Sequence, residues 1–492
     1  MGSVHNGRMT ANGLPGVGYP HGHLGHLEEH EEKALADFKT LLESKGEYTP
    51  GPPANHDDPK LLRFLRARRW VPEDAYKQFS ENEAFRKANQ LDVLYKTMDV
   101  DAYEKTKKLY PRFTGRRDRR GMPVYVYRIS HLDSKAVAAY EKDTQSTYSQ
   151  AETDGKTPAK LLRLIALYED LTGFVQPLCT QLTDREHAPT PITLSTNVVD
   201  ISNVSLKMFW NLRAHMQAAS ELATTHYPET LDRIFIIGAP YFFSTVWGWI
   251  KKWFDPVTVS KIFILTAPEV VPVLSQFMEM KDIPKVYGGE LEWEFFDDPT
   301  WDEGIMKACK WENGHNTFPS GPKRWEAIED GTRLQCYAVG YKDGQPRRDL
   351  VCSIAVAAPV TLTAESTGPV TAHPEAAATQ EVPSAATPVE AAKKTSDTPA
   401  AESTPAAIPA GLVATPAPTA AESTTTTALS EDKLPGAIEV AGMAITMKGE
   451  EVYKGDHITT APIDEVEALK LTDEEVQTLK DKKDATCVPT AA

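Results

Sequence analysis

The sequence predicts an α/β protein with a separate helical lobe at its N-terminal end and a long low-complexity tail at its C-terminal end. Three observations support this class. Apolar residues recur at helical spacing over residues 28–89. Strand and helix patterns then alternate over residues 124–280, which implies crossover connections and a parallel or mixed sheet. From residue 355 to 427 the chain is mainly Ala, Thr, Pro, Ser and Glu, a composition that buries too little apolar surface to fold.

The helical lobe comprises residues 27–95 and follows a Gly-, His- and Pro-rich segment, residues 1–26, that we expect to be disordered. Its first helix begins near Glu28 and ends before the breaker Gly51-Pro52-Pro53. A second helix begins at Asp58-Pro59, where an acidic cap precedes a proline in the first turn. A third helix follows directly, and the three together predict a compact lobe.

An α/β domain is predicted over residues 105–295. Its strands are rich in β-branched and aromatic residues, and its helices show apolar residues at 3–4 spacing. We expect strands at residues 124–129, 192–199, 233–237 and 261–265, and helices at 158–178, 206–225, 242–254 and 270–280. A small extension over residues 296–353 carries Trp301, Trp311 and Trp325, and residues 354–492 form the low-complexity acidic tail.

Charge and cysteine content exclude several classes of protein. The 492-residue chain has a net charge of −16, but residues 351–492 carry 21 Asp and Glu against 9 Lys and Arg. The body is therefore close to neutral, which argues against a strongly basic nucleic-acid binder. Five cysteines without CxxC pairs exclude a disulfide scaffold or a zinc cluster and fit a reducing compartment.

Two arginine-rich runs have alternative interpretations. The first, on the second helix, is either a solvated face or a phosphate-binding surface, because arginine binds phosphate through two parallel hydrogen bonds. The second precedes the first predicted strand, and we interpret it as an exposed loop. The first run consists of Arg63, Arg66, Arg68 and Arg69, and the second of Arg116, Arg117, Arg119 and Arg120.

The predicted helix 242–254 is apolar on nearly all faces. Such a helix is either buried in a core or in contact with lipid, and its tryptophans beside Lys251 and Lys252 suit a membrane interface. The sequence leaves both interpretations open. The apolar residues are Phe242, Phe243, Val246, Trp247, Trp249, Ile250, Trp253 and Phe254.

No catalytic constellation is visible, so the chain is predicted not to be an enzyme. It has no G-x-S-x-G motif, no Walker A motif and no well-placed G-x-G-x-x-G motif. His26-Leu27-Glu28-Glu29-His30 matches H-x-x-E-H, a pattern of some zinc proteases, but it borders the His- and Gly-rich segment, and we interpret it as a solvated helix start. No metal and no cofactor are expected.

Several ordered motifs resemble the CRAL-TRIO lipid-binding family. The resemblance covers roughly residues 33–295, and within the family it is greatest to the secretory-pathway phosphatidylinositol/phosphatidylcholine transfer proteins. It implies a non-catalytic protein that holds one phospholipid in an apolar cavity above a sheet floor, closed by a mobile helix. The motifs are Leu61 to Arg69, Asp118 to Tyr125, His226 to Glu229, Asp255 to Leu265, and Pro284 to Gly289.

The resemblance also implies site residues. Arg68, Arg69, Glu229, Thr258 and Lys261 match contacts to the phosphatidylinositol headgroup. Tyr125, Tyr168 and Ser195 match contacts to the phosphatidylcholine headgroup, whereas Asn197 replaces a threonine and Thr114 a tyrosine. Helix 242–254 is the candidate gate. We therefore expect phosphatidylinositol as ligand, with phosphatidylcholine weaker or absent.

The same resemblance implies the biological setting. It is that of a monomeric cytoplasmic protein, peripherally associated with Golgi or endosomal membranes, that supports phosphoinositide synthesis by lipid kinases and vesicle traffic. Two alternatives are a carrier of a nonpolar lipid, such as a sterol, tocopherol or retinoid, and a scaffold that acts through the acidic tail. Glu229, Thr258 and Lys261 argue against the nonpolar ligand, which has neither phosphate nor inositol.

Overall fold

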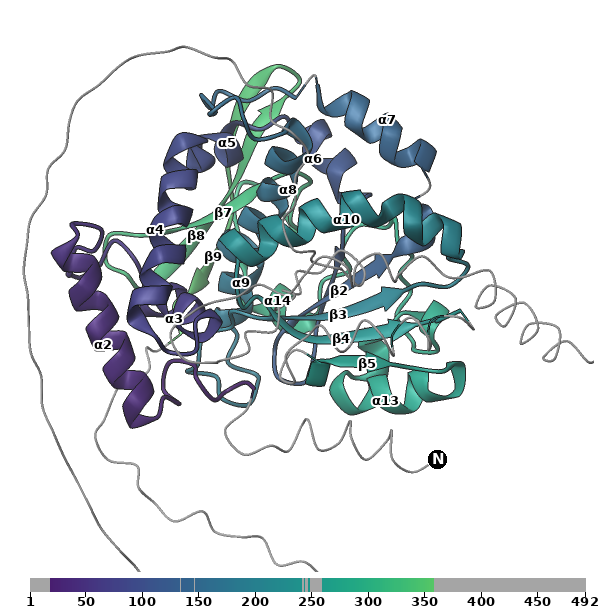
Figure 1. Ribbon diagram of the computed structural model, residues 1–492, viewed down its shortest axis with the longest axis horizontal. Helices are drawn as coiled ribbons and strands as arrows, with labels where there is room; N and C mark the ends of the chain where they lie inside the picture. Colours follow the sequence, from purple (N-terminus) through teal and green to yellow (C-terminus); the bar gives the residue numbers. More distant parts are fainter. Residues whose placement is uncertain are drawn as a thin grey trace, which may run out of the picture. The chain divides into compact units, whose positions relative to one another are not determined.

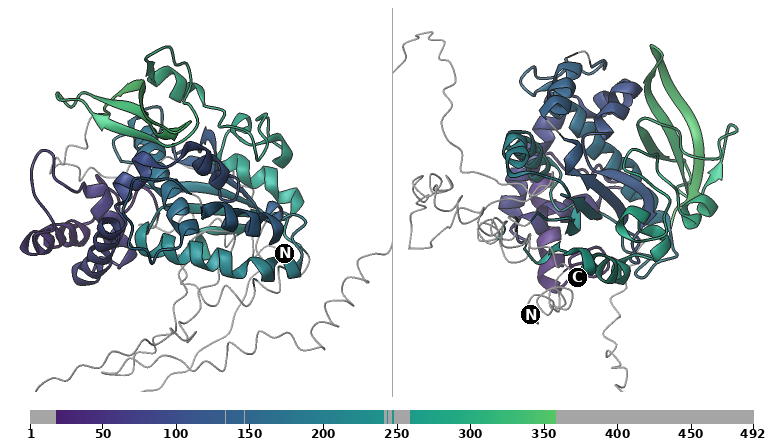
Figure 2. Two further views of the ribbon diagram at one scale, coloured as in Figure 1. Left: turned by 90° about the horizontal axis from the view of Figure 1, so that it is seen from above. Right: turned by 90° about the vertical axis from the view of Figure 1, so that its right-hand side faces the viewer.

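The computed structural model describes residues 18–132, 134–145, 147–240, 243, 247 and 259–357 (Figure 1). The predicted tail from residue 358 onward and most of the predicted helix 242–254 lie outside these residues. The described chain forms a helical lobe, an α/β domain on a five-stranded sheet, and a four-stranded antiparallel sheet near its C-terminal end (Figure 2). The predicted α/β class with an N-terminal helical lobe is confirmed.

The lobe is built from α2 (Glu29–Ser44), α3 (Asp58–Ala67) and α4 (Pro72–Ala88), followed by the shorter α5 (Leu91–Thr97) and α6 (Val100–Lys107). The Asp57 carboxylate caps α3 by accepting from the Lys60 backbone N–H, and Pro59 lies in the first turn. Three buried phenylalanines join the helices, because the Phe79 ring lies edge-on to Phe38 at 5.9 Å and to Phe64 at 5.1 Å.

Residues 18–26 are ordered, contrary to the predicted disorder of residues 1–26. They form turns in which Tyr19 and His23 are buried. The Tyr19 hydroxyl donates to the Thr190 carbonyl at 3.3 Å and accepts from Arg185 at 2.8 Å. These contacts join residues about 170 positions apart in sequence, so no local pattern could indicate them.

The central sheet has strand order β1-β2-β3-β4-β5. Its strands are β1 (Arg112–Arg117), β2 (Pro123–Arg128), β3 (Ser195–Asp200), β4 (Leu231–Ile237) and β5 (Ile262–Ile264). Strands β2 to β5 pair in parallel and β1 pairs antiparallel with β2, so the sheet is mixed. The four predicted strands appear within a few residues of their expected positions, whereas β1 was not predicted.

The connecting helices are α7 (Ser134–Thr144), α8 (Ala159–Asp170), α9 (Gln176–Gln181), α10 (Leu206–His226) and α13 (Val270–Phe277). The predicted single helix 158–178 is instead α8 and α9 joined by a π-helical segment, Leu171–Val175. Helices α10 and α13 lie on opposite sides of the sheet (Figures 1 and 2). This arrangement buries both of its faces, which explains why its strands are apolar without strict alternation.

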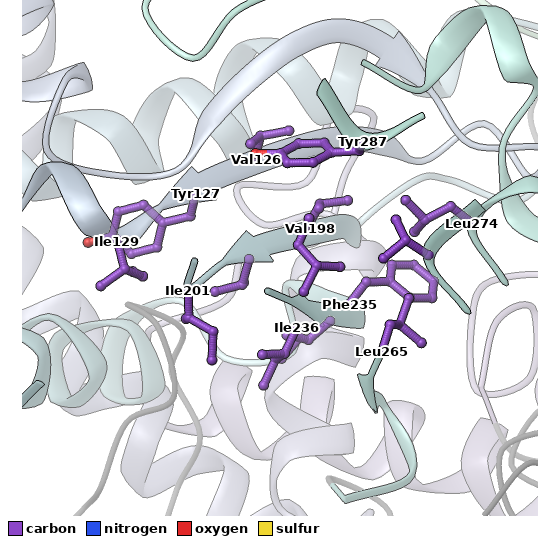
Figure 3. Close-up of a cluster of buried hydrophobic side chains, with 14 of the residues drawn as sticks. Val126, Tyr127, Ile129, Val198, Ile201, Phe235, Ile236, Leu265, Leu274 and Tyr287 are labelled. Carbon is purple, nitrogen blue, oxygen red and sulfur yellow. The ribbon is translucent and has the colours of Figure 1, made fainter. Parts of the chain in front are cut away.

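The core of the α/β domain lies between the sheet and its helices (Figure 3). The Phe235 ring lies 5.2 Å from the Phe277 ring of α13, and the Arg233 guanidinium lies 4.5 Å from the centre of the Phe277 ring. Tyr287, beyond α13, donates from its hydroxyl to Asp200 at 3.2 Å and so fixes the segment after α13 to the end of β3.

The second arginine run is an exposed loop only in part, because Arg119 and Arg120 lie in the turn before β2 and Arg119 is exposed. Arg116 and Arg117 belong to β1, and Arg117 is held by the carboxylates of Asp184 and Asp302 at 2.7–2.9 Å. Arg120 pairs with Asp232 and Asp118. These carboxylates neutralise the arginines, so the run offers little free positive charge.

The C-terminal extension contains α14 (Glu303–Ala308) and a sheet of order β6-β9-β8-β7, namely β6 (Lys310–Trp311), β7 (Lys323–Ala327), β8 (Arg333–Lys342) and β9 (Gln345–Ala355). It shares a core with the α/β domain, where Trp325, Phe318, Phe174 and Leu178 are buried together. The Trp325 indole donates to the Phe174 carbonyl at 3.0 Å. The extension therefore covers the segment between α8 and α9.

Candidate functional site

The predicted phosphatidylinositol-headgroup residues begin at the end of α3. Arg68 caps this helix and donates to the Ala67 carbonyl at 3.3 Å, and Arg69 follows with a left-handed backbone of φ 52°. Arg68 is half-buried and Arg69 is exposed. Within the described residues neither arginine has a carboxylate partner, so both guanidinium groups are available to an anion.

Glu229 and Lys261 form an ion pair at 3.3 Å, between the turn after α10 and the start of β5. The Lys261 ammonium also donates to the Leu231 carbonyl at 3.4 Å. Glu229 has a left-handed backbone of φ 53°, which is uncommon for a residue other than glycine and tends to occur at functional sites. Thr258, the fifth predicted residue, lies outside the described residues.

Arg66 connects these two groups of residues. Burial lowers the pKa of its guanidinium to about 10, while the charge of Glu229 acts in the opposite direction. One guanidinium N–H donates to the Gly22 carbonyl at 2.9 Å. The structure therefore brings the end of α3 close to the Glu229–Lys261 pair, as the predicted site requires.

The N-terminal turns reach the same place, and sequence reasoning missed them. His23 is buried, and its pKa is lowered well below the usual value by burial and then by the charges of Arg66 and Lys261. The histidine is therefore neutral and lies beside the cations of the candidate site. A Gly- and His-rich segment has the composition of a disordered one, and nothing in its pattern indicated this contact.

The polar residues of the predicted choline-headgroup site donate hydrogen bonds to neighbouring protein atoms. The Ser195 hydroxyl donates to the Thr230 carbonyl at 3.1 Å, and the Asn197 amide donates to the Ser195 hydroxyl, also at 3.1 Å. Both side chains are buried. Thr114, where a tyrosine was expected, donates to the Val124 carbonyl at 3.0 Å.

The two tyrosines of this predicted site lie in aromatic stacks. Tyr125 is opposite Asn197 in the β2–β3 register and stacks on Phe113, with ring centres 5.5 Å apart. Tyr168 on α8 stacks on Tyr227 at 4.7 Å. Tyr125, Ser195 and Asn197 are thus neighbours on two strands, and Tyr168 is linked to them through Tyr227 and Thr230.

Only two residues of the candidate gate are described. Phe243 is 3% exposed and belongs to the core cluster, and Trp247 is partly buried against the same cluster. The other six predicted gate residues, Phe242, Val246, Trp249, Ile250, Trp253 and Phe254, lie outside the described residues. Phe243 and Trp247 therefore pack with the core cluster, and contact of the predicted helix with membrane stays a prediction.

Within the described ranges, no three His, Cys, Asp or Glu side chains are grouped closely enough to hold a metal ion. His26 of the H-x-x-E-H motif lies edge-on to His187 at 4.9 Å. Cys179, Cys309, Cys336 and Cys352 are free and buried. Among the helices that the structure describes, none combines the length and the apolar character needed to cross a membrane.

The mixed sheet with flanking helices and an N-terminal helical lobe defines a known class of domain. The family model described as the CRAL/TRIO domain matches residues 107–289, and the CRAL/TRIO N-terminal domain matches residues 25–81. The chain belongs to the CRAL/TRIO family, and the resemblance that the motifs suggested is confirmed.

Curated relatives match over the lobe and the α/β domain. The Sec14 cytosolic factor of Schizosaccharomyces pombe is 30% identical over 274 residues, which cover 56% of this chain and 87% of that protein. The SEC14 cytosolic factor of Kluyveromyces lactis is 29% identical over 54% of this chain and 81% of its own length. The phosphatidylinositol/phosphatidylcholine transfer protein SFH9 of Arabidopsis thaliana is 28% identical over 58% of this chain and 46% of its own.

Proposed function

We propose that the protein binds phosphatidylinositol and exchanges it at membrane surfaces without catalysing a reaction. The names of its relatives, which include a phosphatidylinositol/phosphatidylcholine transfer protein, support this class of ligand. The choice of phosphatidylinositol as the headgroup rests on one observation. Two arginines without a carboxylate partner in the described chain, Arg68 and Arg69, follow Arg66, whose charge interacts with that of Glu229 in the Glu229–Lys261 pair. Cations suit the phosphate, and a carboxylate suits inositol hydroxyls.

The energetics of lipid exchange explain why such a carrier is needed. Each methylene transferred from water to an apolar site gains about 0.8 kcal/mol, so two acyl chains oppose desorption by roughly 20 kcal/mol or more. A protein cavity that opens only on the membrane removes most of this barrier. In this proposal helix 242–254 is the gate, and its tryptophans contact the bilayer interface.

Phosphatidylcholine is a weaker ligand in this proposal. The Asn197 amide and the Thr114 hydroxyl donate to neighbouring protein atoms, so neither donates freely to a ligand phosphate. An aromatic wall favours a quaternary ammonium, but Thr114 provides no ring, which leaves Tyr125 and Tyr168 for this role. The setting that we propose is cytoplasmic and peripheral at Golgi or endosomal membranes, with a monomer that supports lipid kinases and vesicle traffic.

The decisive experiment identifies the lipid that co-purifies with the full-length protein. Organic extraction followed by mass spectrometry should recover phosphatidylinositol in excess over phosphatidylcholine. Recovery of a sterol, tocopherol or retinoid instead would show that the ligand is nonpolar and that the headgroup residues are structural. Vesicle-to-vesicle transfer assays with both phospholipids would then measure whether the bound lipid is also exchanged.

A further inference from the structure

A cavity lies between the helical lobe and the α/β domain. Its volume is about 430 Å³, within the range of small-molecule sites. One wall comes from α3 and α4 and the other from the π-helical segment and α9. None of the residues that line it, among them Lys60, Arg63, Gln176 and Thr193, is a predicted headgroup residue.

Arg63 supplies this cavity with a positive charge that no described carboxylate contacts directly, although the charges of Asp57 and Glu169 act on its pKa. Its side chain is 8% exposed, and its Nε donates to the Pro228 carbonyl at 2.9 Å. Within the described residues its two terminal N–H₂ groups donate no hydrogen bond and no carboxylate pairs with it. Burial and then the charge of Arg66 lower the pKa of Arg63 to about 10, so the guanidinium remains charged at neutral pH.

The other cations of the cavity differ from Arg63 in this respect. Arg86 pairs with both oxygens of Glu169 at 2.6 and 3.0 Å, and Lys60 pairs with Glu83 at 2.8 Å. A buried charge without a counter-ion is costly. Two of the three cations, Arg86 and Lys60, have a direct carboxylate partner, and the described residues provide none for Arg63. This difference favours a ligand as the direct counter-ion of Arg63.

Gln176 adds an independent observation. Its side chain is 4% exposed and lines the same cavity, yet its buried Nε2 has no hydrogen-bond partner in the described chain. Native proteins seldom leave such a donor unsatisfied. Gln176 directly follows the π-helical segment Leu171–Val175, an irregularity that is frequent at functional sites.

We propose that this cavity binds the phosphate group of a small ligand, held by the terminal N–H₂ groups of Arg63 and by the Gln176 amide. An arginine fork matches two phosphate oxygens, and a neutral amide donor can serve a third. The ligand bridges α3 of the lobe and α9 of the α/β domain, so its binding stabilises their contact. The phosphate monoester belongs either to a free metabolite or to a lipid headgroup.

The test uses glycerol 3-phosphate as the free probe and the full-length protein. Isothermal titration calorimetry should detect binding, and the ligand should raise the melting temperature. Gln176→Met should bind about tenfold more weakly, the value of one hydrogen bond to a charged group. It should melt like the wild type without ligand, because the lost amide has no partner. Arg63→Lys, which keeps the charge and loses the fork, should also bind more weakly.

Two controls make the result decisive. Gln276→Met removes a glutamine whose amide donates within α13, far from the cavity lining, and should bind like the wild type. Vesicles of phosphatidylcholine with phosphatidic acid supply a lipid-borne monoester. If these vesicles bind more wild-type protein than Gln176→Met protein, the phosphate comes from a lipid. If the vesicles bind both proteins equally, but glycerol 3-phosphate binds the wild type more tightly than the variant, the phosphate comes from a free metabolite.

The proposal fails if the wild type binds neither glycerol 3-phosphate nor the phosphatidic acid vesicles more tightly than Gln176→Met does, or if binding is lost in Lys261→Ala and unchanged in Gln176→Met. The second result would place the anion in the headgroup site. Phosphatidylinositol transfer should be unaffected by Gln176→Met, so failure of the cavity proposal and failure of the transfer proposal are distinguishable.

Discussion

The role of a cation in this protein depends on whether a carboxylate lies within reach. Arg117 contacts two carboxylates and holds β1 in place, whereas Arg68 and Arg69 have none in the described chain. The same residue type is therefore structural in one place and available to a ligand in another. Sequence alone showed two similar arginine runs, and only the tertiary partners distinguish them.

The first prediction concerns Lys261. Replacing it by alanine removes the charge-assisted contact to the ligand phosphate that we propose for this residue, worth about 1.5–3 kcal/mol. We expect phosphatidylinositol transfer to fall by about tenfold or more, with phosphatidylcholine transfer spared, since that headgroup is assigned to the Ser195 region. Parallel vesicle transfer assays measure both.

Lys285→Ala is the matched control. It also breaks a lysine–glutamate ion pair, the pair with Glu292, but this pair is exposed. Equal loss for both lipids would show that the two headgroup sites are not separate.

The second prediction concerns His215 of α10. Burial, and then the charge of Lys160, lower the pKa of this histidine from 6.5 to about 4, although Glu141 opposes them. The unfolded chain therefore binds a proton between pH 6.5 and 4 that the folded chain does not, and stability falls as the pH is lowered through this range. At pH 5 the loss from this residue is about 2 kcal/mol.

His215→Phe tests this effect. The phenylalanine ring can keep the stack on Tyr110, where the ring centres lie 5.4 Å apart. The imidazole Nε2 has no hydrogen-bond partner in the described chain, so its removal costs little at pH 7. Urea unfolding measures the free energy of unfolding at pH 7 and pH 5. Its decrease between the two pH values should be smaller in the variant than in the wild type by about 2 kcal/mol. The same loss in both proteins would mean that His215 is protonated in the folded state.

At the scale of elements, the sequence predicts best those strands that are buried on both faces. β2, β3 and β4 are apolar, β-branched runs between turn residues, and each was expected from this pattern. β1 was missed because it reads RFTGRR, and its last two arginines, Arg116 and Arg117, are neutralised by carboxylates that are distant in sequence, namely Asp184, Asp302 and Asp282. A local pattern contains no information about such partners.

The residues of the candidate site also differ in whether a local sequence pattern could predict them. All five predicted headgroup residues belong to contiguous motifs of the sequence. In the structure the charge of Glu229, which pairs with Lys261, acts on Arg66 near the end of α3, and the role of these residues in lipid binding stays a prediction. The N-terminal turns beside Arg66 could not be foreseen, since a Gly- and His-rich segment has no apolar period. The terminal N–H₂ groups of Arg63 and the Gln176 amide have no partner among the described residues, and a sequence pattern cannot show this because it depends on the neighbours in space.

The third prediction tests the gate helix. Trp247 is partly buried against the core, and Trp249 lies outside the described residues. Replacing both by serine should slow lipid transfer more than it lowers stability, because the proposed membrane contact of the two tryptophans outweighs the partial core contact of Trp247. Phe243→Ala is the contrasting variant. Phe243 is buried in the core cluster, so its truncation should destabilise the fold by about 3–5 kcal/mol. Global unfolding of the tryptophan variant, seen by circular dichroism, would show that the whole helix is core.

At the scale of the whole molecule, the extension and the α/β domain form one folding unit. The cluster around Phe174 and Trp325 draws side chains from β1, from the helices after α8 and from the C-terminal sheet. Tyr95 of the lobe accepts from the Lys323 backbone N–H at 3.1 Å and donates to the Lys323 carbonyl at 2.7 Å. The small extension is thus continuous with both the lobe and the α/β domain. Removing it would expose a large apolar surface.

The last prediction compares two truncations. The predicted tail begins at residue 354, but β9 extends to Ala355 and the Ala357 backbone N–H donates to Gln181 at 2.8 Å. A cut after residue 357 keeps these contacts, and the removed segment has a composition that cannot form a core. Melting temperature and phosphatidylinositol transfer should therefore stay near the full-length values. A cut after residue 295 removes Trp325 and its partners and should yield an aggregated or unfolded protein.

If the cut after residue 357 abolishes transfer while the circular dichroism spectrum and the melting temperature are unchanged, the tail takes part in exchange and the scaffold alternative gains support. If the cut after residue 295 leaves a stable protein that still transfers lipid, the core shared by the extension and the α/β domain contributes little to the fold.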